Sequence, residues 1–200
     1  MPSDSICFGN SDLPVEIVDY INVLGFDGPD FIQEMLSPTR KLFIWEGPSR
    51  TGKSTLSQKI SSNYPQDTRV TSLSSLMRRD VLNPELCQIL KDKCKLVIVE
   101  YSDCYGEEES GSLPSMIKRL LCRDKIYVRE FNEKGREFEP NFNILMICND
   151  LPKYYKEIVD QERDSSWWGW FKSFIVLPPS PKKVENFRGF TLVRFTKLFN

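Results

Sequence analysis

Short runs dominated by apolar residues alternate along this chain with segments whose apolar residues recur every three or four positions. The apolar runs, which are typical of buried strands, cover residues 42–45, 96–99, 143–148 and 174–177. Residues 69–72 form a further candidate strand. Because such strands alternate with helical patterns, the sequence predicts an α/β domain with a central, mostly parallel sheet flanked by helices.

Helical spacing of the apolar residues predicts the elements between these strands. Residues 13–36 have this spacing, and a break containing glycine and proline at 25–29 divides them into two short helices. The other helical patterns cover residues 55–60, 74–79, 84–90 and 113–121. Residues 126–138 predict a protruding β-hairpin, because two strand-like stretches flank a charged segment with a glycine. We expect three parts: an N-terminal helical extension over 1–38, a core over 39–180 and a basic C-terminal tail over 181–200.

The loop after the first predicted strand carries the most specific motif in the chain. It matches the phosphate-binding P-loop pattern G-x-x-x-x-G-K-S/T, and it stands between a strand and a helix, as that motif requires. Gly47 and Gly52 allow the backbone to turn its N–H groups toward an anion, and the helix N-terminus adds positive potential. We expect Lys53 to reach the β- and γ-phosphates of ATP and Ser54 to ligate Mg²⁺. The expected ATP-binding residues are Gly47, Pro48, Ser49, Arg50, Thr51, Gly52, Lys53, Ser54 and Thr55.

Two later strands end in a polar side chain. Glu100 follows the strand at 96–99, and Asn149 follows the strand at 143–148. Because the carboxyl ends of parallel strands open beside the phosphate-binding loop, we expect Glu100 to ligate Mg²⁺ or to activate the attacking water. Asn149 would orient that water and sense hydrolysis. Each signal is weak by itself, and the order of the three pieces along the chain supports them together.

Composition excludes several classes of protein. The 200 residues include no histidine, which excludes Ser-His-Asp and Cys-His hydrolases and leaves a carboxylate as the general base. Six cysteines without C-x-x-C spacing predict reduced thiols rather than disulfides or structural zinc. No apolar run approaches the ~18–20 residues of a membrane span, and residues 1–5 lack the features of a signal peptide. We therefore expect no membrane partner and a location in the cytoplasm or nucleus, without secretion.

Charge is distributed unevenly along the chain. The net charge is −1, whereas residues 118–136 and 181–200 each carry a net charge of +4. Two local basic regions on a nearly neutral chain favour a groove or pore that holds nucleic acid over a uniformly basic face.

Taken in order, these features resemble the superfamily 3 helicases, small AAA+-type ring ATPases encoded mostly by viruses and mobile elements. The resemblance covers about residues 40–178. Its first two markers are the loop at 47–54 and Val97-Ile98-Val99-Glu100. Residues 117–129 are similar to the K-x-L-T-G-G-D-x-I-x-x-R segment of phage and large-DNA-virus primase–helicases. Residues 138–152 are similar to the ending F-x-P … N-x-L-P.

The resemblance implies a P-loop ATPase with an AAA+-like fold that moves on single-stranded DNA during viral or mobile-element genome replication. It implies a homo-hexamer and replication partners such as a primase or a polymerase. It also implies that the hairpin at 126–138 lines the pore of the ring. Lys134 and Arg136 would hold the DNA backbone there, since flexible cations hold phosphates without selecting bases, and Lys118 is a further basic contact.

The chain departs from the family pattern in three respects. Cys122 and Arg123 stand where the family usually has glycines. Gly169 and Trp170 stand where the family usually has two arginines that act on the neighbouring subunit, so that Arg163 or Lys172 substitutes or the ATPase is weak. The absence of histidine also excludes the histidine pair of a fused nicking endonuclease. The chain therefore resembles a helicase core alone, as a fragment of a larger protein or a divergent copy.

Three alternatives stay open. The helicase half of a circular single-stranded DNA virus replication protein usually has two carboxylates where this chain has Glu100 and Tyr101, which disfavours it. A P-loop kinase of nucleotides or small molecules would have a similar length, but Arg163 is the only arginine over 153–172, which supports an arginine-rich lid poorly. An ATP-binding assembly or regulatory subunit with weak or lost hydrolysis would explain the missing arginine pair.

Overall fold

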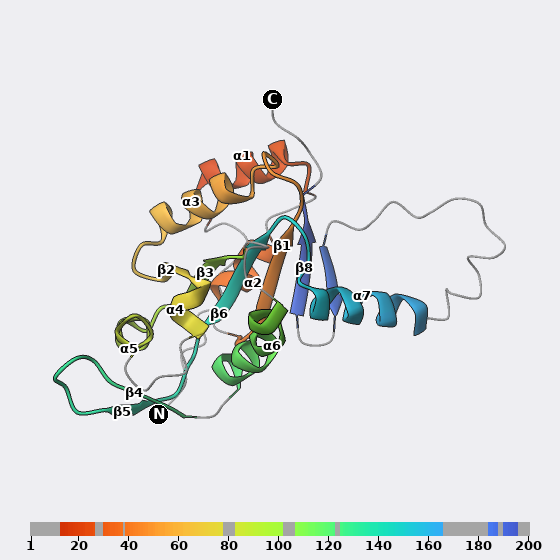
Figure 1. Cartoon of the computed structure of the whole chain (residues 1–200). Coiled ribbons are helices and arrows are strands. Elements are labelled where there is room, and N and C mark those ends of the chain that lie inside the picture. Colours follow the sequence, from red (N-terminus) through yellow and green to blue (C-terminus); the bar gives the residue numbers. More distant parts are fainter. Residues whose placement is uncertain are drawn as a thin grey trace, which may run out of the picture.

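The central element of the fold is a six-stranded sheet with helices on both faces (Figure 1). The computed structural model describes residues 13–26, 30–37, 39–77, 83–101, 107–122, 125–165, 184–187 and 190–195. The strands lie in the order β2 (Thr68–Ser72), β3 (Leu96–Glu100), β6 (Asn143–Cys148), β1 (Leu42–Glu46), β8 (Phe190–Arg194) and β7 (Val184–Phe187). The first five are parallel to one another, and β7 is antiparallel to β8.

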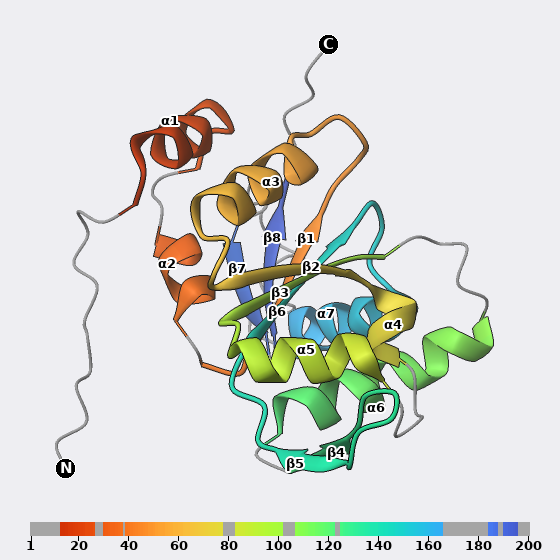
Figure 2. The same ribbon diagram turned by 90° about the vertical axis from the view of Figure 1, so that its left-hand side faces the viewer.

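Alternate side chains of the central strands enter two separate hydrophobic cores. Leu42 and Ile44 belong to one core, whereas Phe43 and Trp45 belong to the other. The core around Phe43 is closed by α1 (Val15–Val23), α2 (Asp30–Leu36) and α3 (Lys53–Asn63). The core around Ile44 is closed by α4 (Leu73–Met77), α5 (Pro84–Asp92), α6 (Glu107–Leu121) and α7 (Lys153–Ser165). Figure 2 shows these two helical layers on opposite sides of the sheet.

The predicted α/β architecture with a mostly parallel sheet is confirmed, and the sequence analysis missed two strands. β7 and β8 lie in the segment that we expected to be a basic tail, and β8 pairs with the central strand β1. The run Phe190-Thr191-Leu192-Val193-Arg194 is short and mostly apolar, and its charged flanks concealed it as a strand. The structure also extends α6 six residues ahead of its expected start at Leu113. The strand expected at 174–177 lies outside the described residues.

A buried asparagine joins three segments at the start of β6. The Asn143 Nδ2 group donates hydrogen bonds to the carbonyls of Met35 at 2.8 Å and Ser37 at 2.6 Å. Its Oδ1 accepts from the Lys41 N–H at 2.8 Å and from the Thr39 hydroxyl at 3.2 Å. Buried amides are stable only when such partners are present, so this side chain fixes the end of α2 and the entry to β1 against β6.

Replacing Asn143 by leucine should destabilise the fold by about 2–4 kcal/mol, because it leaves buried backbone groups without partners. The free energy of unfolding in urea, followed by circular dichroism, measures this loss. Asn63→Leu is the matched control, since the Asn63 amide is exposed and donates only to the Lys59 carbonyl in its own helix. A loss for Asn143→Leu no larger than that of the control would contradict the structural role of the amide.

The hairpin expected at 126–138 forms from β4 (Ile126–Val128) and β5 (Arg136–Phe138), which pair antiparallel. The hairpin directly precedes β6 and so lies at the amino end of that strand. β1 is parallel to β6, and the glycine-rich loop follows the carboxyl end of β1. The hairpin and the loop at 47–54 are therefore at opposite ends of the sheet, as both views show (Figures 1 and 2).

Among the described helices, none combines the length and the apolar character that crossing a membrane requires.

Candidate functional site

The glycine-rich loop, residues 47–54, turns the chain from the end of β1 into α3. Gly52 is the residue before α3 and has a left-handed backbone with φ of 87°. Gly47 has φ of 153°, and a Cβ atom added there would lie 2.2 Å from the carbonyl oxygen of Phe195. The end of β8 therefore approaches the loop so closely that only glycine fits at position 47.

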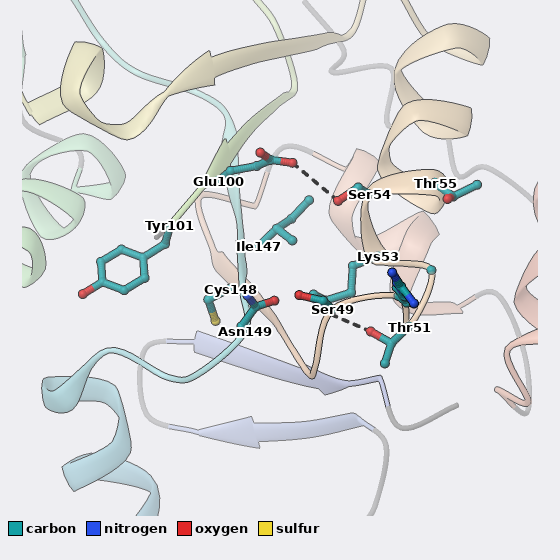
Figure 3. A pocket seen from close by; sticks show the side chains of 12 residues that line it. Ser49, Thr51, Lys53, Ser54, Thr55, Glu100, Tyr101, Ile147, Cys148 and Asn149 are labelled. Carbon is teal, nitrogen blue, oxygen red and sulfur yellow. Dashed lines mark hydrogen bonds between the residues drawn. The ribbon is translucent and has the colours of Figure 1, made fainter. Parts of the chain in front are cut away.

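The loop borders a cavity of about 350 Å³ at the carboxyl edge of the sheet (Figure 3). Strand order explains the arrangement: β6 lies between β1 and β3, so the ends of all three strands open onto the same space. Glu100 enters from the end of β3 and Asn149 from the end of β6. The full lining is Ser49, Arg50, Thr51, Gly52, Lys53, Ser54, Thr55, Glu100, Tyr101, Ile147, Cys148 and Asn149.

Two oxygen-bearing side chains face each other across this cavity. The Ser54 hydroxyl at the first turn of α3 donates to Glu100 Oε1 at 3.5 Å, and both side chains are exposed (Figure 3). The described residues contain no cluster of three or more His, Cys, Asp or Glu side chains that could hold a metal alone. A hydroxyl and one carboxylate suit a hard cation such as Mg²⁺ when a phosphate supplies further oxygen ligands.

Lys53 is buried, and its ammonium group lies against the loop itself. Its Nζ donates to the Gly47 carbonyl, to the Pro48 carbonyl at 2.8 Å and to the Thr51 hydroxyl at 3.2 Å. The Thr51 hydroxyl in turn donates to the Pro48 carbonyl at 2.8 Å. Burial lowers the pKa of Lys53, because it disfavours the charged ammonium. An anion in the cavity would favour the charged form of Lys53, and the lysine would exchange loop carbonyls for anionic oxygens.

A second set of contacts supports the loop from the side of β8. Arg194 Nε donates to Glu46 Oε2 at 3.1 Å, and the same guanidinium contacts the Glu185 carboxylate. The Phe195 N–H donates to the Glu46 carbonyl at 2.8 Å. A second depression beside the main cavity is lined by Glu46, Gly47, Pro48, Asn149, Asp150, Arg194 and Phe195. This support was missed from sequence, although the short, mostly apolar run that ends at Arg194 is a signal for it.

The structure brings together most of the residues that the sequence singled out around the loop. Residues 49–55 line the cavity with Glu100 and Asn149, and Gly47 and Pro48 line the adjoining depression. Sequence reasoning did not name Tyr101, Ile147 or Cys148 as lining residues. Their signal was available, because each lies within two positions of Glu100 or Asn149, the strand-end residues that were named.

The expected DNA-binding residues fall into two places. Lys134 and Arg136 are exposed on the hairpin. Lys118 lies in the last turn of α6 and lines a different depression, between α6 and α7, with Arg40 and Tyr154. Arg163 lies near the end of α7, and Lys172, Gly169 and Trp170 lie outside the described residues.

Comparison with known proteins shows the fold and no family. No family model matches the chain, and no curated protein matches it. The apo structure of the NrS-1 C-terminal region is similar, with a TM-score of 0.54, and its A form apo structure has a TM-score of 0.52. Each is 17% identical, and each alignment covers 70% of this chain and 35% of the solved chain. This chain thus spans about a third of the solved chains, with which it shares an α/β fold.

Proposed function

We propose that this chain is the ATPase core of a superfamily 3, AAA+-type helicase that moves along single-stranded DNA in viral or mobile-element replication. The observation that carries the proposal is the contact of 3.5 Å between Ser54 and Glu100 beside Asn149 and the glycine-rich loop. Three segments that lie far apart in sequence place a phosphate cradle, a carboxylate and an amide around one cavity. This combination is what hydrolysis of a nucleoside triphosphate requires.

The residues present suit ATP and Mg²⁺. The loop backbone and the start of α3 would hold the phosphates, and Lys53 would contact the β- and γ-oxygens. Ser54 and Glu100 would hold the cation, which on binding neutralises charge on the phosphates. Glu100 would accept the proton of the attacking water, and Asn149 would orient that water by hydrogen bonding. In this scheme the missing histidine is no obstacle, because the general base is a carboxylate.

The position of the hairpin supports a separate nucleic-acid contact. β6 runs directly from the hairpin side of the sheet to Asn149, over about 20 Å for its six residues. Arg40 fastens the connection between hairpin and strand, since it contacts Glu139 at 2.8 Å and Asn141 at 3.3 Å. A force on the hairpin would therefore reach the cavity through one short, well-anchored strand.

The wider assembly is part of the same proposal and derives from the resemblance. A homo-hexamer in the host cytoplasm or nucleus would place the hairpins around a central pore. Arg163 or Lys172 would act on the neighbouring subunit's nucleotide. A primase or a polymerase would be the replication partner.

The Lys134→Ala variant should reduce the stimulation of ATP hydrolysis by single-stranded DNA about tenfold and spare basal hydrolysis. Each lost phosphate contact should also lower the slope of log affinity against log salt by ~0.7. Lys125→Ala is the matched control, because that residue directly precedes the same hairpin but its ammonium pairs with Glu137 at 3.7 Å. Unchanged DNA stimulation in Lys134→Ala would remove this residue from the proposed contact.

The proposal as a whole is tested by ATP turnover of the purified protein, with and without single-stranded DNA, across protein concentration. Turnover that rises with both DNA and protein concentration is the expected result, since each site is completed by a neighbour. ATP binding without DNA-stimulated turnover would favour the second candidate, an ATP-binding assembly or regulatory subunit. Gly169 and Trp170, in place of the expected arginine pair, are the observation that favours that candidate.

A further inference from the structure

An aromatic side chain stands in solvent at the tip of the hairpin. Phe131 is 73% exposed, the highest value among the large hydrophobic residues that the structure describes. Single exposed apolar residues are common on protein surfaces, so the exposure alone carries no function. The charged residues of the hairpin distinguish Phe131 from such residues, because the acidic side chains of the tip form ion pairs with α5, whereas three basic side chains of the hairpin form none among the described residues.

The two carboxylates of the tip face α5, where a single lysine contacts both of them. Lys91, near the end of α5, contacts Glu130 at 2.9 Å and Glu133 at 3.3 Å. The hydrogen bond from Lys91 lowers the pKa of Glu130. Figure 2 shows the hairpin lying along α5. Contact with Lys91 of α5 thus offsets one of the two negative charges of the tip.

Three basic side chains of the hairpin differ from these carboxylates in their ion pairing. Arg129, Lys134 and Arg136 are all exposed. Among the residues that the structure describes, none of these three side chains makes an ion pair. Phe131 thus shares the hairpin with three positive charges that form no ion pair among the described residues, a composition typical of surfaces that bind single-stranded nucleic acid.

A second aromatic residue holds the tip in shape. A Cβ atom added at Gly135 would lie 2.2 Å from the Tyr127 ring, so this ring packs directly over the glycine backbone. A tip braced in this way from β4 presents Phe131 at lower entropic cost than a free loop would.

We propose that Phe131 stacks on an unpaired base of the bound strand while Arg129, Lys134 and Arg136 hold the neighbouring phosphates. This assignment rests on the proposed function and adds a base contact to it. The occupant is a single strand, because the bases of a duplex present only their edges. A protein partner would need a wider apolar patch than one phenyl ring surrounded by cations. Stacking on any base also suits a contact that must not select sequence.

The test compares two fluorescent oligonucleotides of equal length, oligothymidylate and a strand with abasic sites, by anisotropy at fixed salt. The wild-type protein should prefer the strand with bases. Phe131→Ala should weaken binding to that strand about 5- to 100-fold, the range expected for a lost stack, and leave the abasic strand unaffected. Phe131→Trp should restore the preference, and Phe131→Leu should not. Lys134→Ala, the matched control, should weaken both strands equally.

Several outcomes would overturn the inference. Equal binding of both strands by the wild-type protein, or wild-type binding by Phe131→Leu, would exclude stacking and leave the helicase proposal intact. A variant Phe131→Ala that binds DNA normally but elutes as a smaller assembly in gel filtration would show a contact between subunits instead. Absence of any single-strand binding by the wild-type protein would overturn the proposed function together with this inference.

Discussion

Lys53→Ala should lower ATP affinity by roughly 10²-fold or more, because a charge-assisted contact with phosphate is lost from the centre of the site. Isothermal titration with a non-hydrolysable ATP analogue measures the dissociation constant directly. The loop also loses the ammonium that joins the carbonyls of Gly47 and Pro48. Part of the loss in affinity will therefore come from a less ordered cradle.

Lys59→Ala is the matched control for this variant. Lys59 lies on the same helix, and its ammonium sits over the Tyr20 ring at 5.6 Å, away from the cavity lining. Its removal should leave ATP affinity within a factor of about two. Circular dichroism should show both variants folded, because the six-stranded sheet does not depend on either side chain. An ATP affinity for Lys53→Ala within a factor of about three of wild type would exclude the loop as the phosphate site.

Glu100→Gln should reduce ATP turnover by about 10²- to 10⁴-fold while ATP still binds. Glutamine has the shape of glutamate and can keep the contact with Ser54, but it cannot accept the proton of the attacking water. The ATP-bound state should therefore accumulate, and binding of single-stranded DNA should tighten. Single-turnover hydrolysis together with ATP affinity separates these two effects.

Glu85→Gln provides the control, since that carboxylate lies on α5 and contacts Arg69 at 3.3 Å, and it is not part of the cavity lining. It should hydrolyse ATP at the wild-type rate. A fall in turnover for Glu100→Gln of less than about tenfold would mean that another group supplies the base. Loss of ATP binding in the same variant would assign Glu100 to the cation alone.

The elements that the sequence predicted well are those whose signal is local. β3 and β6 are mostly apolar runs that were recognisable as strands. Their order after the loop motif supported the prediction that the polar residues at their ends, Glu100 and Asn149, lie at the carboxyl edge of a parallel sheet. The loop motif required its two glycines, and both have the positive φ values that glycine accommodates. These inferences needed only neighbours in sequence.

The features that sequence patterns did not reveal depend on contacts between distant segments. Arg194 supports the loop only because β8 pairs with β1, and the short alternation of β8 is surrounded by charges that suggested a tail. The ion pairs of the acidic residues at the hairpin tip depend on Lys91 of α5, which nothing in the hairpin sequence indicates. The hydrogen bond from the Lys53 ammonium to the Pro48 carbonyl likewise forms only in the folded loop.

The contact between Glu46 and Arg194 has a consequence for how the protein is made. The two residues are 148 positions apart, so at ~5–20 residues per second the ribosome delivers β8 roughly 7–30 s after the glycine-rich loop. β1 has no neighbouring strand until β6 emerges, and until β8 emerges the backbone N–H and C=O groups on its other edge remain unpaired and can pair with other chains. The glycine-rich loop is thus synthesised early, and the strand that supports it is synthesised late. Nascent chains should be most prone to aggregation, and most dependent on chaperones, in the stage before β8 emerges.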